Sequence, residues 1–197
     1  KKTIGYDTTV GEVLKTVIQD KPYYRRSGGG MTLSGGESLY QPEFARALLQ
    51  ACRENGINTA IETTLCADWK TVEPFIPLID TFLVDIKHMD SDKHKAFTGQ
   101  PNEQILENAR WIAENAKHFV VRVPVVPTFN DTEEEIEQMC RLLSRLGGNI
   151  RYELIGFHTL GFGKYVDLGM DNPMAGARDL EQTRLDELRQ ILKKCGF

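Results

Sequence analysis

The sequence lacks long hydrophobic runs, an excess of positive charge and clustered cysteines. No apolar stretch approaches the roughly 18 residues that span a bilayer, so we expect no membrane partner. Lys and Arg number 24 against 28 Asp and Glu, which argues against a nucleic-acid partner bound through its phosphates. With 41% hydrophobic residues in 197, the composition predicts a single globular domain over residues 1–197.

The four cysteines are far apart in the chain and form no CxxC motif, zinc-ribbon spacing or disulfide framework. We therefore expect a reducing compartment, the cytoplasm. Cys52, Cys140 and Cys195 lie on apolar faces of predicted helices, where we expect them to be core residues. Cys66 follows a predicted strand.

Hydrophobic periodicity predicts an alternation of helices and strands along the whole chain. Strands are expected over 30–34, 58–64, 81–87, 119–126 and 151–158. Helices are expected over 10–19, 42–55, 69–76, 103–117, 132–146 and 180–195. Three local signals refine these elements. Pro77 breaks the third helix, Pro124 requires a bulge or an unpaired amide position in its strand, and Thr132 with Glu135 forms a capping box.

Apolar strands that alternate with helices predict an α/β fold with a parallel sheet. The pattern begins with a helix and is shorter than the roughly 250 residues of a complete (β/α) barrel. The pattern therefore predicts either an open doubly wound sheet or a partial (β/α) barrel of about five strands whose first strand is missing from this chain.

Ligands of parallel α/β folds bind at the carboxyl ends of the strands, and here those ends are unusually polar. The first strand lies in a glycine-rich segment, 27–37, which reads Ser-Gly-Gly-Gly-Met-Thr-Leu-Ser-Gly-Gly-Glu. Glycine lets the backbone approach a ligand closely, although a glycine-rich bend in the sheet would read the same way. The segment does not have the spacing of a Walker phosphate loop.

Four strand-end motifs together carry a family resemblance. They are residues 27–37, Asp-Ile-Lys at 85–87, Arg-Val-Pro-Val-Val-Pro at 122–127, and Glu-Leu-Ile-Gly-Phe-His at 153–158. In order and spacing they resemble the radical S-adenosylmethionine activating enzymes of glycyl radical enzymes, the pyruvate formate-lyase activating enzyme family. The resemblance covers essentially the whole chain and implies a (β/α) barrel that binds S-adenosylmethionine.

The resemblance also implies roles for individual residues. Ser34, Gly35, Gly36 and Glu37 match the turn that receives the methionine ammonium, and Lys87 matches a lysine that faces the methionine carboxylate. Glu62, Thr63 and Asp85 match the surroundings of a monovalent cation, and Arg122 and His158 match residues that line the nucleoside. In the family, a reduced cluster cleaves the cofactor to a 5′-deoxyadenosyl radical, which takes a hydrogen atom from a glycine of the partner enzyme. The implied partners are a glycyl radical enzyme and, as electron donor, flavodoxin or ferredoxin.

The sequence departs from the family in two places. The C-x3-C-x2-C motif that holds the [4Fe–4S] cluster is absent, so we expect no cluster ligand in this chain and a fragment that binds the cofactor weakly at most. Where some relatives have Asp-Thr-Asn-Gly, residues 62–65 read Glu-Thr-Thr-Leu. The longer glutamate predicts a shifted or empty cation site.

Other interpretations remain open at this stage. Asp85 and Lys87 could form a simple structural ion pair, His158 could be a buried core histidine, and Arg122 could be a structural strand residue. Lys87 could alternatively act as the Schiff-base lysine of an aldolase-like barrel. A third hypothesis is a non-catalytic α/β module that binds an adenosyl ligand or a protein partner.

Overall fold

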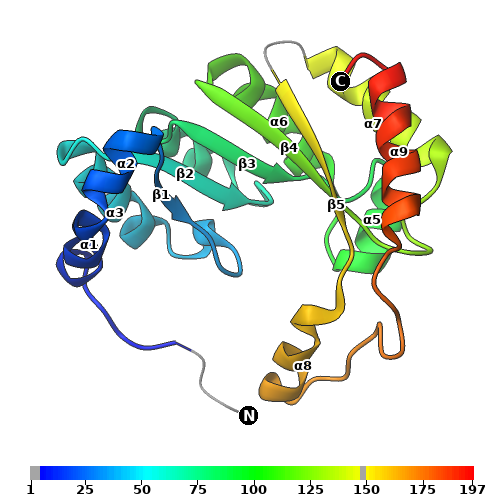
Figure 1. Cartoon of the computed structure of the whole chain (residues 1–197), viewed down its shortest axis with the longest axis horizontal. Helices are drawn as coiled ribbons and strands as arrows, with labels where there is room; N and C mark the ends of the chain where they lie inside the picture. The colour runs from blue at the N-terminus through cyan, green and yellow to red at the C-terminus, as the bar shows by residue number, and fades with distance from the viewer. Residues whose placement is uncertain (1–4, 147–149) are drawn as a thin grey trace.

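The computed structural model describes residues 5–146 and 150–197 and contains one curved parallel sheet (Figure 1). Its strands pair in the order in which they occur in the chain: β1 (Gly30–Leu33), β2 (Asn58–Thr63), β3 (Thr81–Asp85), β4 (His118–Val125) and β5 (Ile150–Gly156). All five predicted strands are therefore confirmed, and each ends one or two residues earlier than expected. The prediction of one domain over 1–197 includes residues 1–4 and 147–149, which lie outside the described residues.

The helices lie mainly on the convex side of the sheet (Figure 1). They are α1 (Val10–Gln19), α2 (Lys21–Ser27), α3 (Pro42–Glu54), α4 (Trp69–Val72), α5 (Ser91–Thr98), α6 (Glu103–Asn115), α7 (Glu133–Leu146), α8 (Phe162–Leu168) and α9 (Gln182–Lys194). Three 3-10 turns complete the described part: η1 (Ser38–Tyr40), η2 (Glu73–Leu78) and η3 (Thr159–Gly161). No helix among the described residues combines the length and apolarity needed to cross a membrane.

The sequential strand order and the one-sided helix layer decide between the two predicted architectures. A doubly wound sheet carries helices on both faces and reverses its strand order at a switch point. Here the order never reverses, and the concave face stays open between β1 and β5 (Figure 1). The fold is a partial (β/α) barrel, as predicted.

The core lies between the convex face of the sheet and the helices. Ile61, Val84 and Val121 on three neighbouring strands are fully buried there, against Leu49 of α3 and Ile112 of α6. Since side chains alternate along a strand, the residues between these apolar ones point to the concave face.

Three helices were not predicted: α2, α5 and α8. Helix periodicity is visible where several apolar side chains at helical spacing pack towards the core. Helices α2 and α8 bury no residue, and α5 buries only His94. The helix predicted over 69–76 is also shorter than expected, because α4 ends at Val72 and the chain continues through Pro77 as η2.

Pro124 occupies an unpaired amide position rather than a bulge. The register between β4 and β5 runs without interruption from Phe119 to Val125. On the other side, β3 pairs only as far as Asp85 opposite Arg122, and the last bond runs from the Ile86 amide to the Arg122 carbonyl. The missing N–H of Pro124 therefore lies where the ladder with β3 has ended.

The predicted capping box at α7 is only half formed. The Glu135 amide donates to Oγ1 of Thr132 at 3.3 Å, as a capping box requires. The Glu135 carboxylate, however, does not reach back to Thr132. Its Oε1 accepts hydrogen bonds from Lys93 at 2.8 Å and from buried His88 at 2.9 Å, which ties α7 to the loop after β3.

Candidate functional site

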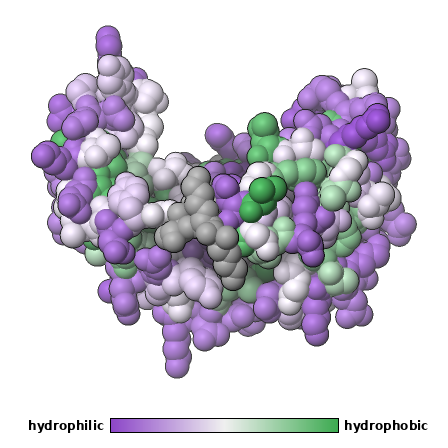
Figure 2. Space-filling model, turned by 90° about the horizontal axis from the view of Figure 1, so that it is seen from below, coloured by the Kyte–Doolittle hydropathy of each residue, from purple (hydrophilic) through white to green (hydrophobic). Residues whose placement is uncertain are grey.

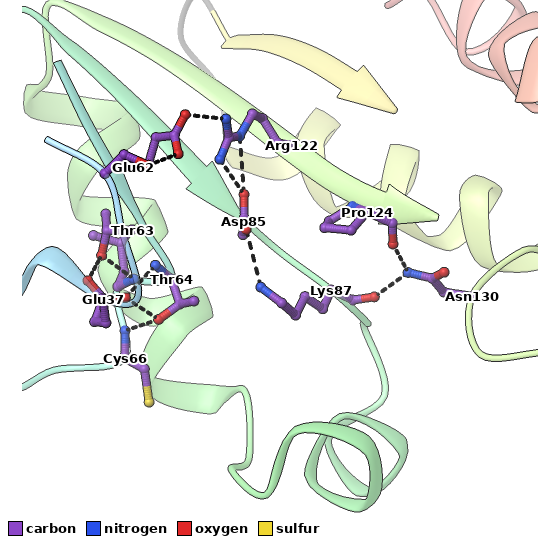
Figure 3. A network of polar contacts seen from close by, with 12 residues as sticks. Glu37, Glu62, Thr63, Thr64, Cys66, Asp85, Lys87, Arg122, Pro124 and Asn130 are labelled. Atoms are coloured by element: carbon purple, nitrogen blue, oxygen red, sulfur yellow. Dashed lines mark hydrogen bonds and ion pairs between the residues drawn. The ribbon is translucent and has the colours of Figure 1, made fainter. Parts of the chain in front are cut away.

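The concave face carries a line of alternating charges across β2, β3 and β4 (Figure 3). Arg122 lies opposite Asp85 in the β3–β4 register and contacts Asp85 Oδ1 through Nε at 3.1 Å and Nη2 at 3.0 Å. Its Nη1 contacts Glu62 Oε1 at 2.8 Å. One planar guanidinium thus bridges two carboxylates from two other strands.

The line extends at both ends. Lys87 Nζ lies 3.3 Å from Asp85 Oδ2, and the Ser34 hydroxyl donates to Glu62 Oε2 at 2.6 Å. Four predicted site residues on strands or at strand ends, together with Ser34, therefore meet in one continuous network. Asp85 and Lys87 do form the ion pair of the alternative interpretation. That pair is one part of a larger network, which Arg122 and Glu62 extend.

The network favours the charged states of Glu62 and Arg122. The hydrogen bond from Ser34 lowers the pKa of Glu62, burial opposes this, and Arg122 lowers the pKa further. Burial alone would lower the pKa of Arg122, but Glu62 and Asp85 outweigh it and raise the pKa above its ordinary value. Both charges of the bridge are thus stabilised where they lie.

The glycine-rich segment contains β1 and the turn after it, and its glycines are needed for different structural reasons. A Cβ on Gly30 would lie 1.9 Å from the Asn58 carbonyl oxygen, so only glycine allows β1 and β2 to approach this closely. Gly35 has a φ of 137° and faces open space. Among the hydrogen bonds of the described residues, none uses the carbonyls of Ser34, Gly35 or Gly36. Those carbonyls are free to accept from a ligand.

Glu37 lies in this turn, but its carboxylate is already occupied. Oε1 accepts from the Leu39 amide at 3.0 Å and the Thr63 hydroxyl at 2.7 Å. Oε2 accepts from the amide and hydroxyl of Thr64 at 2.8 and 2.7 Å (Figure 3). The hydrogen bonds of Glu37 therefore hold the turn after β1 against the end of β2.

The three residues matched to a cation site do not converge. Thr63 is buried on the helix-covered face with its hydroxyl on Glu37, whereas Glu62 and Asp85 lie on the concave face. The guanidinium of Arg122 supplies the positive charge between those two carboxylates. The monovalent-cation site stays a prediction.

His158 follows β5 and is exposed, so the alternative of a buried core histidine is wrong. Within the described ranges no hydrogen bond or ion pair joins it to the Arg122 network. Its charged neighbour is Asp179, which accepts from the Thr159 amide at 2.7 Å. This backbone hydrogen bond lowers the pKa of Asp179, and His158 adds a smaller effect in the same direction.

An apolar cleft that the sequence did not reveal borders Lys87. It has a volume of about 470 Å³ and is lined chiefly by aromatic and apolar side chains. Phe97 and Phe129 stack at a centroid distance of 4.0 Å on one side, and Phe157, Tyr165 and Met174 contribute the other. On this side of the molecule the surface is hollowed between two raised lobes (Figure 2). The lining residues come from six separate segments, so no local motif points to them.

The cysteines take no part in this site. Cys52 and Cys140 are buried as predicted, but Cys195 is exposed at the end of α9, so its assignment to the core is wrong. Cys66 is exposed just after β2. No group of three or more metal-binding side chains occurs among residues 5–146 and 150–197. The described residues therefore do not fit an iron–sulfur cluster.

Comparisons with known proteins agree with this fold. The family model of the radical SAM superfamily matches residues 2–143. This chain belongs to the radical SAM superfamily. Within the superfamily, the chain groups with the activating enzymes of glycyl radical enzymes. It is 38% identical to the choline trimethylamine-lyase activating enzyme of Oleidesulfovibrio alaskensis over 98% of this chain and 64% of that protein.

Two further relatives support this grouping of the radical SAM chain. It is 34% identical to the pyruvate formate-lyase-activating enzyme of Clostridium pasteurianum, over 96% of this chain and 79% of that protein. A crystal structure of a domain of the corresponding enzyme from Bacteroides vulgatus superposes with a TM-score of 0.69 and 31% identity, covering 86% of this chain and 96% of that one. The chain spans less than two thirds of the length of several curated relatives that it matches.

Proposed function

We propose that this chain binds S-adenosylmethionine across the carboxyl ends of its five strands and forms the barrel part of an activating enzyme of a glycyl radical enzyme. The observation that supports this most directly is the continuous line Ser34, Glu62, Arg122, Asp85 and Lys87. Residues on or directly after four neighbouring strands, which the resemblance matches to the cofactor or to a cation beside it, meet on a single open face.

The amino-acid end of the cofactor carries an ammonium and a carboxylate, and the site offers a complement for both. The free carbonyls of Ser34, Gly35 and Gly36 are acceptors for its ammonium. Lys87 is the donor for its carboxylate, since the Lys87 side chain is 31% exposed and its bond to Asp85, at 3.3 Å, is the longest in the network. Arg122 is held by two carboxylates, so its role is to fix the face on which the cofactor lies.

The adenosyl part requires an apolar surface with few polar groups. The cleft bordered by Lys87 and lined by Phe97, Phe129, Phe157 and Tyr165 provides one. His158 comes directly after Phe157, beyond the end of β5. It is available to a ligand because its side chain is exposed.

When bound to the holoenzyme with its reduced cluster, S-adenosylmethionine would supply a 5′-deoxyadenosyl radical. The residues described here bind and orient the cofactor and exclude water from its apolar part. The partner would be a glycyl radical enzyme, with flavodoxin or ferredoxin as electron donor in the cytoplasm. The Schiff-base alternative is less well supported. Lys87 borders the apolar cleft, but it is ion-paired with Asp85 and partly exposed, whereas such a lysine needs a free amine in an apolar pocket.

Substitution of Lys87 tests the proposal. Lys87→Gln is expected to weaken S-adenosylmethionine binding to this chain by about tenfold or more, because a charged hydrogen bond to the methionine carboxylate is lost. Isothermal titration calorimetry measures the change. Lys117→Gln is the matched control, since Lys117 pairs with Asp80 at 3.0 Å at the opposite end of the sheet.

Equal affinity of the Lys87→Gln variant and the unchanged chain would contradict the proposal. A second measurement addresses the cluster. The chain mixed with S-adenosylmethionine and dithionite is expected to release no 5′-deoxyadenosine, and release at an appreciable rate would show that the described residues hold the cluster after all.

A further inference from the structure

Three buried asparagines hold the loops that follow β2, β3 and β4. Asn102, Asn108 and Asn130 are each only 2–3% exposed. Each uses its side-chain NH2 group to donate to two backbone carbonyls: Asn108 to Leu65 and Ala67, Asn102 to His88 and Met89, and Asn130 to Lys87 and Pro124. All three pairs of carbonyls lie at the carboxyl ends of strands, where the candidate site is built.

Asn130 is the one of the three that contacts a candidate site residue directly. Its Nδ2 donates to the Lys87 carbonyl at 2.6 Å and to the Pro124 carbonyl at 2.8 Å (Figure 3). Its Oδ1 accepts from the Val126 amide at 2.7 Å. The side chain therefore joins the end of β3 to the end of β4 at the point where the regular ladder has stopped.

This position matters because Lys87 has little other support. β3 ends at Asp85, and Lys87 lies two residues beyond it. Its side chain is partly exposed and contacts only Asp85 among the described ion pairs. The buried Asn130 amide, which donates to the Lys87 carbonyl, thus determines which positions the Lys87 ammonium can reach.

We propose that Asn130 is a positioning residue that fixes the Lys87 backbone so that the Lys87 ammonium meets the carboxylate of S-adenosylmethionine. This inference rests on the proposed function, because it assigns Lys87 to that carboxylate. Asn130 itself does not touch the cofactor. It acts through Lys87, and its contribution therefore depends on the presence of the Lys87 ammonium.

Asn108 provides a matched control. It has the same burial and the same pair of carbonyl bonds, but those carbonyls belong to Leu65 and Ala67, on the loop after β2. If buried asparagines supported only the fold, Asn108→Ala and Asn130→Ala would lower stability alike and change cofactor affinity alike.

The decisive experiment is a double-mutant cycle by calorimetry with S-adenosylmethionine. Asn130→Ala is expected to weaken binding about tenfold, as is typical when a partner that orients a binding residue is lost. In the Lys87→Gln background the same change is expected to have an effect within twofold. Asn108→Ala is expected to leave affinity within twofold. Asn130→Asp is the second variant, because it keeps the volume and the acceptor for Val126 but loses both donors.

An affinity unchanged by both Asn130 variants would overturn the inference, as would a full tenfold loss in the Lys87→Gln background. Amide hydrogen exchange at residues 86–90 gives a readout without cofactor. Asn130→Asp is expected to speed exchange there, and Asn108→Ala is not. If the unchanged chain bound no S-adenosylmethionine, the proposed function would fail, whereas unchanged exchange at 86–90 would count against Asn130 alone.

Discussion

Two non-glycine residues hold a left-handed backbone conformation beyond the carboxyl ends of β2 and β4. Leu65, just after β2, has a φ of 57°, and Thr128, just after β4, has a φ of 67°. Such conformations cost L-residues roughly 1–2 kcal/mol. Leu65 stands where some relatives have the glycine of Asp-Thr-Asn-Gly, and it is fully buried, so packing compensates for the strain. Thr128 is exposed and has no such compensation.

Glycine substitution should therefore have opposite effects at these two positions. Thr128→Gly is expected to stabilise the chain by up to about 1 kcal/mol, because strain is relieved and the amide can still bond Asp131. Leu65→Gly is expected to destabilise it by about 3 kcal/mol, since a buried leucine leaves a cavity. Urea unfolding measures both, and a loss of stability in Thr128→Gly would contradict the strain argument.

At this scale the sequence predicted which residues face one another better than what each of them does. Ser34, Glu62, Asp85, Lys87 and Arg122 lie together because strand alternation and parallel register bring strand ends to one edge. Glu37 bonds the end of β2, and Thr63 is buried, because of the conformation of one turn. No residue pattern encodes that conformation. Asn130 was missed because a single asparagine in a loop gives no periodic signal.

At the scale of elements, the start of α7 is tied to the loop after β3 by Glu135. Burial would raise the pKa of this carboxyl, but the Lys93 and His88 hydrogen bonds outweigh it, and the pKa falls below the ordinary value of 4.5. A depressed carboxyl pKa stabilises the fold above the unfolded-state pKa. That stabilisation is lost as the pH falls through the folded-state value.

Glu135→Gln is accordingly expected to destabilise the chain by about 2 kcal/mol at pH 7, because the bonds from Lys93 and His88 lose their charged acceptor. The difference from the unchanged chain should shrink below about pH 4.5, as that carboxyl becomes protonated in both the folded and unfolded states. Thermal unfolding across pH 3–7 tests this. The adjacent and exposed Glu134→Gln is the control, and an equal effect there would refute the assignment.

Elements with a buried apolar stripe were predictable, and the short connecting helices were not. The helices α3, α6, α7 and α9 all carry several buried side chains at helical spacing, and all were expected near their observed bounds. Helix α8 and the segment after it were missed, and with them the wall of the apolar cleft that includes Tyr165 and Met174.

At the scale of the whole molecule, a structural ion-pair cluster and the proposed binding residues lie at opposite ends of the sheet. At the amino end, Asp80 bonds the Thr59 amide at 3.0 Å and the Lys117 ammonium at 3.0 Å, with Arg53 at 3.7 Å. The residues proposed to bind the cofactor all lie towards the carboxyl end. In barrels of this type the amino end commonly serves the fold alone.

Asp80→Ala is expected to lower the free energy of unfolding by about 2 kcal/mol, since Thr59 and Lys117 lose a partly buried charged partner. Its affinity for S-adenosylmethionine should stay within twofold of the unchanged chain. Chemical denaturation and calorimetry on the same preparation give both values. A large loss of affinity in a folded Asp80→Ala variant would mean that the two ends are coupled.

The overall architecture was predictable because it follows from the order of apolar segments, whereas the curvature that gathers the strand ends comes from packing among distant residues. The unbroken strand order also has a consequence for how the chain folds. Each strand pairs with its successor, as Thr81 does with His118, so every pairing closes a loop of fewer than about 40 residues. Each new strand can therefore pair with the edge strand of the sheet that formed just before it. The sheet can grow in the direction of synthesis, without waiting for its carboxyl-terminal strand.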